Sequence, residues 1–321
     1  MNWGFIGCGS VTEIKSGPAY QQTKGFKVLA VMRRNEEKLQ DFAKRHNIEK
    51  TYTNADALIN DPNIDAVYIA TPPDTHKLYA LKVAKTGKPC CIEKPLSPSF
   101  ADSLEIQKAF EEKDIPLFVA YYRRSLPRFL KIKAWLDNNE IGEIRHISAH
   151  LSKPANKLDL SKNKNWRTEI NIAEAGYFDD LASHGLDLFT YFLGDIEIAK
   201  GISLNQQGLY TAKDAVTASW LHKNGITGSG TWNFSCSDHV DQVIIYGSKG
   251  TISFSVFHDK PIILKNNTKN EELFIENPIH IQQYHVKNIS RYFKDNKNIH
   301  PSTGKTALHT SWVMSKILDA I

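Results

Sequence analysis

The sequence predicts an α/β protein in which a parallel sheet is followed by a second part built on a mainly antiparallel sheet. Three observations support this prediction. Short apolar runs alternate with helical patterns over residues 1–125, strand and hairpin signals occupy residues 144–151, 214–234 and 242–257, and helical patterns return after residue 281. With 321 residues, the chain is long enough for two domains of ordinary size.

Five apolar runs in the first part are expected to be strands, because each is short, β-branched or aromatic, and bounded by turn residues. They lie at residues 2–6, 27–31, 66–70, 89–92 and 116–120. Helical spacing of apolar residues lies between them, at 35–46, 74–86 and 99–113. Strands that alternate with helices in this way form a parallel sheet covered on both faces.

The second part is predicted to contain few helices. After a helix at about 127–138, apolar and polar residues alternate over 144–151, as in a strand with one wet face. A hairpin is expected around Lys223-Asn224-Gly225, because Asn-Gly favours tight hairpin turns, and another pair of strand runs flanks residues 247–250. Helices follow at about 281–295 and 305–321, and we expect the last to pack against the first domain. The predicted domains are therefore residues 1–122 and 123–321.

Composition argues against several classes of protein. The formal net charge is +5, and the densest basic runs, Arg33-Arg34 and Arg123-Arg124, are too short to form a nucleic-acid stripe. No apolar stretch approaches the length of a membrane span. Because a strand is predicted from residue 2, we expect no signal peptide before it. The four cysteines form no C-x-x-C pair, so no disulfide framework or metal site is expected, and the composition suits a reducing cytoplasm.

A dinucleotide-binding loop is predicted directly after the first strand. Its residues are Gly7, Cys8, Gly9, Ser10, Val11 and Thr12. Gly7 permits a tight turn, and Gly9 lets backbone amides approach a pyrophosphate, although Thr12 stands where Gly or Ala is usual. The second strand ends at Arg33 and Arg34 rather than at an acid, and guanidinium groups suit a 2′-phosphate. We therefore expect NADP(H) to be preferred, with NAD(H) as the alternative.

Three further segments complete a recognisable series. Thr71-Pro72-Pro73-Asp74-Thr75-His76 follows one parallel strand, and Glu93-Lys94-Pro95 follows the next. Asp180-x-x-x-His184-x-x-Asp187 lies on a predicted helix of the second part. Together with the glycine loop, the order and spacing of these motifs resemble the glucose–fructose oxidoreductase, inositol dehydrogenase and rhizopine-catabolism family (Gfo/Idh/MocA) over essentially the whole chain.

The resemblance implies a Rossmann domain followed by an α/β domain with a large, open-faced sheet, and a substrate held between that sheet and the nicotinamide. It assigns Lys94, Asp180 and His184 to catalysis, with Ala182 in place of the family's central glycine. On the cofactor side, it adds Thr71, Pro72, His76, Glu93 and Lys94. On the substrate side, it adds Tyr122, Arg123, Trp166, Arg167, Asp180 and His184, although Tyr122 departs from the family's Asn-x-Arg pattern.

The residues themselves agree with these roles. Asp180, His184 and Asp187 are spaced i, i+4 and i+7, so they share one face of a helix. Histidine titrates near neutrality and suits removal of a hydroxyl proton during hydride transfer. Lys94 follows a parallel strand, where ligands bind in such sheets, and its ammonium can stabilise a developing alkoxide. Asp180 can orient a substrate hydroxyl or hold His184.

The expected function is therefore NAD(P)-dependent hydride transfer at a carbinol or carbonyl carbon of a sugar, polyol or related small molecule. Three alternatives remain open: a redox-neutral epimerase or glycoside-cleaving enzyme that retains its cofactor, a non-catalytic dinucleotide-binding sensor on the same fold, and reduction of a non-sugar carbonyl. Because a broad antiparallel sheet exposes one face, we expect a homo-oligomer, either a dimer or a tetramer, formed through that sheet.

Overall fold

The chain folds into two compact units, which are described separately. The computed structural model describes residues 1–161, 165–295 and 297–319. The first unit comprises Met1–Leu126 and Pro278–Leu308. The second comprises Pro127–Asn277 and the described residues of the stretch that begins at His309. The boundary near the C-terminus falls within helix α11 (Gly304–Leu318).

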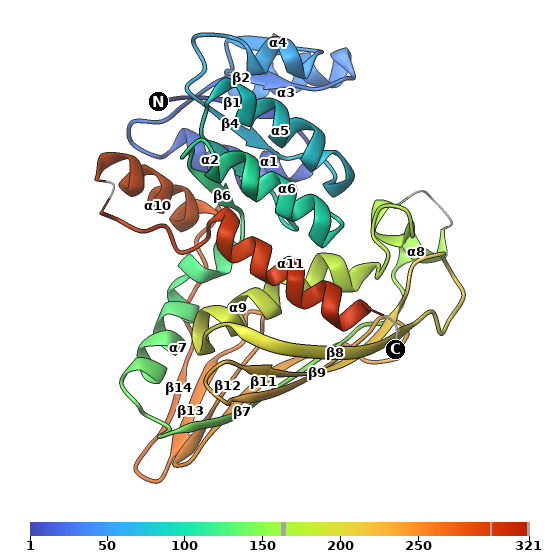
Figure 1. Ribbon diagram of the computed structural model, residues 1–321, viewed down its shortest axis with the longest axis vertical. Helices are drawn as coiled ribbons and strands as arrows, with labels where there is room; N and C mark the ends of the chain where they lie inside the picture. The colour runs from blue at the N-terminus through green and yellow to red at the C-terminus, as the bar shows by residue number, and fades with distance from the viewer. Residues whose placement is uncertain (162–164, 296, 320–321) are drawn as a thin grey trace. The chain divides into compact units, whose positions relative to one another are not determined.

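The first unit is built on a six-stranded parallel sheet with the order β3-β2-β1-β4-β5-β6 (Figure 1). The strands are β1 (Asn2–Ile6), β2 (Lys27–Met32), β3 (Lys50–Tyr52), β4 (Ala66–Ile69), β5 (Cys90–Ile92) and β6 (Leu117–Val119). Strand order reverses between β1 and β4, which is the doubly wound arrangement in which ligands bind beyond the carboxyl ends of the strands. The loops that begin at Gly7 and Thr71 follow these two strands.

Two apolar clusters cover the faces of this sheet. One contains Leu58, Val83 and Ile106 from helices α4 (Ala55–Ile59), α5 (His76–Thr86) and α6 (Phe100–Glu111). The other contains residues of α2 (Gly17–Gln21), α3 (Glu36–His46) and α10 (Gln283–Lys294). Helix α10 therefore completes the apolar covering of a sheet whose strands lie far away in the sequence. The short helix α1 (Ser10–Ile14) follows the glycine loop.

The second unit is built on an eight-stranded sheet with the order β14-β13-β12-β11-β7-β10-β9-β8. The strands are β7 (Ile144–Ser152), β8 (Ile196–Leu204), β9 (Ala215–His222), β10 (Thr227–Asn233), β11 (Val240–Gly247), β12 (Gly250–Phe254), β13 (Ile262–Asn266) and β14 (Asn270–Leu273). Both predicted hairpins are present, as β9–β10 and β11–β12. Within this second sheet, as far as the described residues go, only the β7–β10 pairing is parallel, so the predicted mainly antiparallel character is confirmed.

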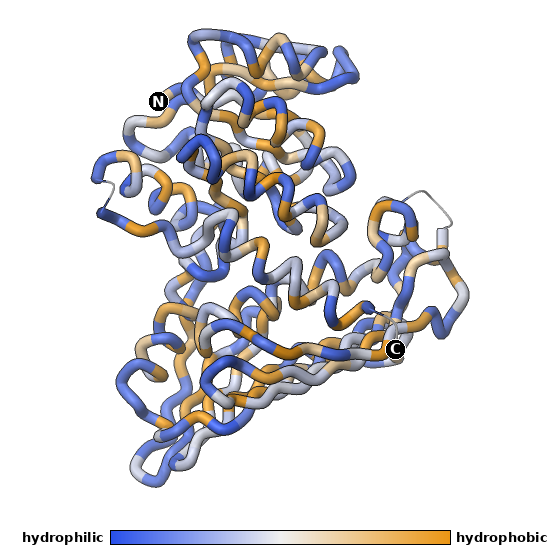
Figure 2. Tube along the Cα trace, in the orientation of Figure 1, coloured by the Kyte–Doolittle hydropathy of each residue, from blue (hydrophilic) through white to orange (hydrophobic). Residues whose placement is uncertain are grey.

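Helices cover one face of this second sheet. Phe178 and Phe189, from the turn before α9 (Ser183–Leu193) and from α9 itself, pack on Trp232 and Trp220. Phe129 of α7 (Pro127–Asp137) packs on Phe254. Hydrophobic residues recur along the strands of both units (Figure 2). The opposite face exposes polar side chains such as those of Thr217 and Ser219, as the expected alternation requires.

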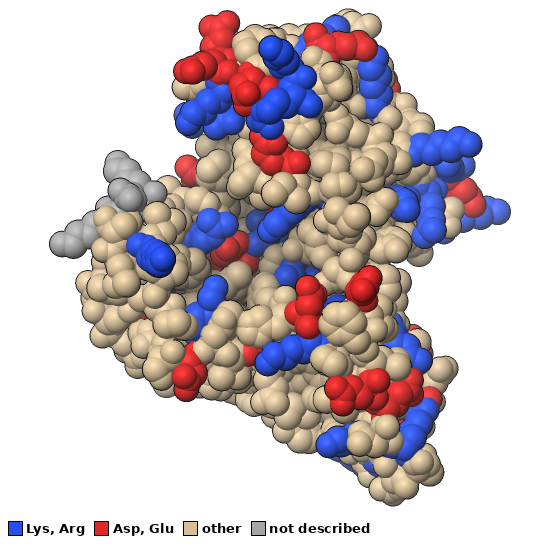
Figure 3. All heavy atoms as spheres, turned by 180° about the vertical axis from the view of Figure 1, so that it is seen from behind, with Lys and Arg blue, Asp and Glu red and all other residues tan. Residues whose placement is uncertain are grey.

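Two surface properties complete the description. On the face drawn in Figure 3, Lys and Arg are interspersed with Asp and Glu, in keeping with the small net charge. None of the helices formed by the described residues combines the length and the apolar character that a membrane span requires.

Candidate active site

The glycine loop after β1 has the conformation that its two glycines predict. Gly7 has a φ of +94°, and a Cβ there would lie 2.8 Å from the carbonyl oxygen of Ala70. A Cβ on Gly9 would meet nothing within 4 Å, so the backbone at Gly9 faces open space that a ligand can approach. Gly7 is thus required by the close passage of β4, and Gly9 leaves a cradle that a side chain would fill.

Thr12 has a local explanation for its departure from the small residue expected there. Its side chain is fully buried, and its hydroxyl donates to the carbonyl oxygen of Gly9 at 2.8 Å. A Cβ on Gly17 would lie 2.1 Å from the carbonyl oxygen of Thr12. The close backbone approach after this loop is therefore made at Gly17, at the start of α2, and Thr12 closes the loop by a hydrogen bond.

The two arginines after β2 differ in their surroundings. Nη1 of Arg33 donates to the carbonyl oxygen of Cys8 at 2.8 Å, so this guanidinium lies against the glycine loop. Arg34 is exposed. Burial raises the pKa of the Cys8 thiol to about 11, so Cys8 stays protonated at neutral pH. These residues fit a dinucleotide: the loop offers an accessible backbone, and a guanidinium borders it.

His76 is fully buried at the start of α5 and links the loops that follow β4 and β5. Its Nε2 lies 2.9 Å from the carbonyl oxygen of Thr71, and its Nδ1 lies 3.0 Å from that of Pro95. Burial lowers the pKa of His76. The buried His76 ring therefore ties the loop containing Thr71 and Pro72 to the loop containing Pro95. Because the ring is fully buried, His76 presents no exposed surface to a ligand.

Glu93 fixes the chain beside Lys94. Its Oε1 accepts hydrogen bonds from the hydroxyl of Tyr68 at 2.5 Å and from Nε2 of Gln282 at 2.6 Å. Tyr68 and Gln282 are both buried, so two buried hydrogen bonds hold the Glu93 carboxylate at the carboxyl end of β5. Gln282, at the start of α10, was not expected from the sequence, because nothing near it marks a partner almost two hundred residues earlier.

Tyr122 and Arg123 lie in a buried 3₁₀ turn (Tyr122–Ser125) of the first unit. The guanidinium of Arg123 lies 5.0 Å from the centre of the Tyr122 ring. Each residue is less than a tenth exposed, and their predicted contact with a substrate stays a prediction.

The second unit carries the Asp180 and His184 motif on an irregular helix. Phe178–Ala182 form a π turn, and α9 continues from Ser183. Such turns are frequent at functional sites. Nε of Arg167 donates to Oδ2 of Asp180 at 2.5 Å, and the guanidinium lies 4.3 Å from the centre of the Trp166 ring. The structure therefore brings together Trp166, Arg167 and Asp180, which are separated by a loop in the sequence.

His184 and Asp187 have different surroundings within α9. The imidazole of His184 is 4% exposed and makes an edge-to-face contact with Phe257, with ring centres 5.9 Å apart. Asp187 is fully buried and accepts a hydrogen bond from the hydroxyl of Thr310 at 3.3 Å. The Asp187 bond thus joins α9 to α11. Phe257, the aromatic neighbour of His184, was not predicted from the sequence.

Asp179 is a buried carboxyl next to Asp180. Its Oδ2 accepts a hydrogen bond from the backbone amide of Ala175 at 3.0 Å. The pKa of Asp179 is raised to about 7, mainly by burial and also by the charges of Glu174 and Asp180, against the opposing effect of the Ala175 amide and Lys213. Because this carboxyl binds its proton more tightly in the folded chain, stability should fall as pH rises from about 4, its unfolded value, to about 7.

The variant Asp179→Asn is therefore expected to become more stable relative to the parent protein as pH rises from about 5 to about 8. Its amide oxygen can still accept from Ala175, and no charge has to be buried. Thermal midpoints of both proteins, measured in a series of buffers, check this. A difference between the two midpoints that is the same at every pH would show that Asp179 does not titrate in this range.

Comparison with known proteins follows the same division of the chain. Residues 1–121 match the oxidoreductase family with an NAD-binding Rossmann fold, and residues 129–253 match the GFO/IDH/MocA C-terminal domain. The protein is thus an oxidoreductase with a dinucleotide-binding domain. It belongs to the Gfo/Idh/MocA family, which confirms the resemblance seen in its motifs.

Individual relatives agree with this assignment. Oxidoreductase P35 of Formosa agariphila is 41% identical over 91% of each chain. Myo-inositol 2-dehydrogenase of Thermotoga maritima is 25% identical over 99% of this chain and 96% of its own. A levoglucosan dehydrogenase, solved with NADH and levoglucosan, has a TM-score of 0.88 at 20% identity and covers 99% of this chain and 96% of its own. The last comparison supports the fold.

Proposed function

We propose that the protein transfers a hydride between a nicotinamide dinucleotide and a carbinol or carbonyl carbon of a sugar, polyol or related small molecule. The observation that carries this proposal is the joined group of Trp166, Arg167 and Asp180, with Asp180 four residues before the motif histidine, in a chain of an oxidoreductase family. Relatives named for myo-inositol and levoglucosan support the substrate class.

Each residue of the motifs has a proposed task. His184 takes the hydroxyl proton during oxidation and returns it during reduction, since imidazole titrates near neutrality. The ammonium of Lys94 stabilises negative charge on the substrate oxygen. Asp180 holds the guanidinium of Arg167, which can then orient a second hydroxyl. The bound nicotinamide supplies or accepts the hydride.

We further propose that NADP(H) is preferred over NAD(H). The loop from Gly7 to Thr12 would hold the pyrophosphate, and Arg33 and Arg34 would pair with the 2′-phosphate. No acidic side chain stands at the end of β2, where an NAD enzyme usually places one for the ribose hydroxyls.

The open face of the second sheet supports an oligomer as a further part of the proposal. On β8, Ile198, Ile202 and Leu204 are 53%, 60% and 42% exposed. The neighbouring strand β9 exposes Thr217 and Ser219, and Thr217 is paired with Ile202. Self-association would remove this apolar edge from water. Sedimentation of the purified protein measures the oligomeric state.

A substrate panel tests the function. Polyols, aldoses and ketoses are each incubated with NAD(H) or NADP(H), and nicotinamide absorbance is followed. Turnover that depends on both the sugar and the cofactor is expected. Cofactor that binds tightly without any turnover would favour the non-catalytic sensor, and cofactor that survives gel filtration with the protein would favour a redox-neutral enzyme.

A further inference from the structure

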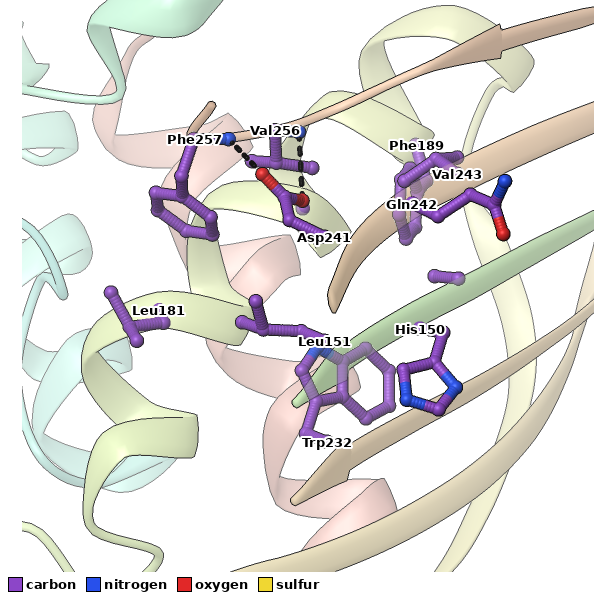
Figure 4. Close-up of a pocket in the computed structure, with 12 residues that line it drawn as sticks. His150, Leu151, Leu181, Phe189, Trp232, Asp241, Gln242, Val243, Val256 and Phe257 are labelled. Carbon is purple, nitrogen blue, oxygen red and sulfur yellow. Dashed lines mark hydrogen bonds between the residues drawn. The ribbon is translucent and has the colours of Figure 1, made fainter. Parts of the chain in front are cut away.

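A loop of the second unit, residues 255–260, approaches the histidine of the catalytic motif. It follows β12 and carries Phe257, whose ring contacts that of His184 at an interplanar angle of 76°. Phe257 and Leu181, the residue after Asp180, both line a small apolar pocket together with Phe189 and Trp232 (Figure 4). The loop therefore places an aromatic side chain directly beside the proposed base.

The amides of this loop are held by one buried carboxylate. The carboxylate of Asp241, 5% exposed on β11, accepts hydrogen bonds from the backbone amides of Val256, Phe257 and His258 at 3.0, 2.7 and 2.9 Å. Two of these bonds are drawn in Figure 4. The hydroxyl of Ser255 also donates to the carbonyl oxygen of Asp241 at 2.7 Å. Charge-assisted bonds of this kind are stronger than neutral ones.

The carbonyl groups of the same loop are held by one buried guanidinium. Arg128 of α7, 3% exposed, donates to the carbonyl oxygens of His258 and Lys260 at 2.9 Å each and to that of Ser255 at 3.3 Å. A short loop that is bound on its amides by an anion and on its carbonyls by a cation has little conformational freedom. Such bracing is expected where a side chain must be placed accurately.

We propose that Phe257 is a positioning residue for His184, and that Asp241 and Arg128 fix the loop that presents it. The ring of Phe257 limits rotation of the imidazole and keeps water from one side of it, so that the ring nitrogens keep the direction needed for proton transfer. This inference rests on the proposed function, in which His184 moves the substrate proton. Neither Phe257 nor its two supports belongs to the motifs by which the sequence was interpreted.

The test compares Phe257→Leu, Phe257→Tyr and a matched control, Phe254→Leu. Phe254 is a buried aromatic of β12, and its ring packs on Phe129 and Phe192 rather than on His184. Phe257→Leu is expected to lower kcat roughly tenfold with cofactor affinity unchanged, because a misoriented base acts on the chemical step. Phe257→Tyr should retain activity, and Phe254→Leu should lower the melting temperature but leave kcat within about twofold.

A second readout does not depend on catalysis. The ring signals of His184, assigned with a His184→Gln variant, are recorded by NMR without cofactor or substrate. Removal of the adjacent aromatic ring should shift these signals in Phe257→Leu and leave them in place in Phe254→Leu. Unchanged His184 signals in Phe257→Leu, or an equal loss of kcat in Phe254→Leu, would overturn the inference. A parent protein without turnover whose His184 signals respond to Phe257 would instead count against the proposed function alone.

Discussion

Replacing His184 with alanine is expected to lower turnover by roughly 10²–10⁴-fold while leaving cofactor affinity nearly unchanged. The variant removes the group that we propose moves the substrate proton, and His184 lies in the second unit, whereas the glycine loop lies in the first. Steady-state rates and cofactor titration measure the two quantities. Lys94→Ala should lower turnover similarly and also weaken substrate binding, since in the proposed reaction its ammonium pairs with the substrate oxygen.

The matched control for this variant is His146→Ala. His146 lies on the open face of the second sheet, with its ring nitrogens 2.9 and 3.1 Å from the hydroxyls of Thr227 and Ser229. Its removal should leave turnover within about twofold, because no proton transfer depends on it. A His184→Ala protein that keeps the activity of the control would exclude the proposed base, even with the family assignment intact.

Loss of both arginines after β2 is expected to weaken NADP(H) binding by about 1.5–3 kcal/mol, the usual value of a charge-assisted hydrogen bond to phosphate. The structure separates their contributions. Arg33 also donates to the carbonyl oxygen of Cys8, so Arg33→Ala should loosen the glycine loop and weaken both cofactors. Arg34 is exposed, so Arg34→Ala should act on NADP(H) alone.

Calorimetric titration of the two single variants and the double variant with NAD(H) and NADP(H) measures these differences. Equal affinity of the parent protein for the two cofactors, with no change in the double variant, would remove the argument for a 2′-phosphate site. Higher salt should reduce the difference between cofactors, because an exposed guanidinium is screened.

The first sheet was predictable because its strands are buried on both faces and therefore appear as continuous apolar runs. Only β3, three partly buried residues from Lys50 to Tyr52, lacked that signal. In the second sheet, β8 was overlooked, although Ile196, Ile198, Ile202 and Leu204 alternate with polar residues in part of it. Strands β13 and β14 have only five and four residues, and β14 carries a single apolar residue, Leu273, so neither shows a recognisable period.

The motif residues of the candidate site were predictable from the sequence, but the residues that hold those motifs in place were not. Gly7, Lys94 and His184 were found because their spacing follows a family pattern. The bond between Arg167 and Asp180 could not be foreseen, since Asp180 lies in a π turn that helical spacing does not predict and its partner lies thirteen residues earlier. Asp241 and Arg128 act on backbone groups of a distant loop, and backbone acceptors leave no trace in the sequence.

The most direct test of hydride transfer uses a substrate from the panel with deuterium at the carbinol carbon. After incubation with oxidised cofactor, the free reduced nicotinamide is isolated and analysed by mass spectrometry and NMR. Direct transfer predicts one deuterium on the nicotinamide ring, none lost to water, and a slower rate for the labelled substrate if hydride transfer limits turnover. Deuterium that appears in water, or a product formed with no net reduction of the cofactor, would contradict the proposed reaction.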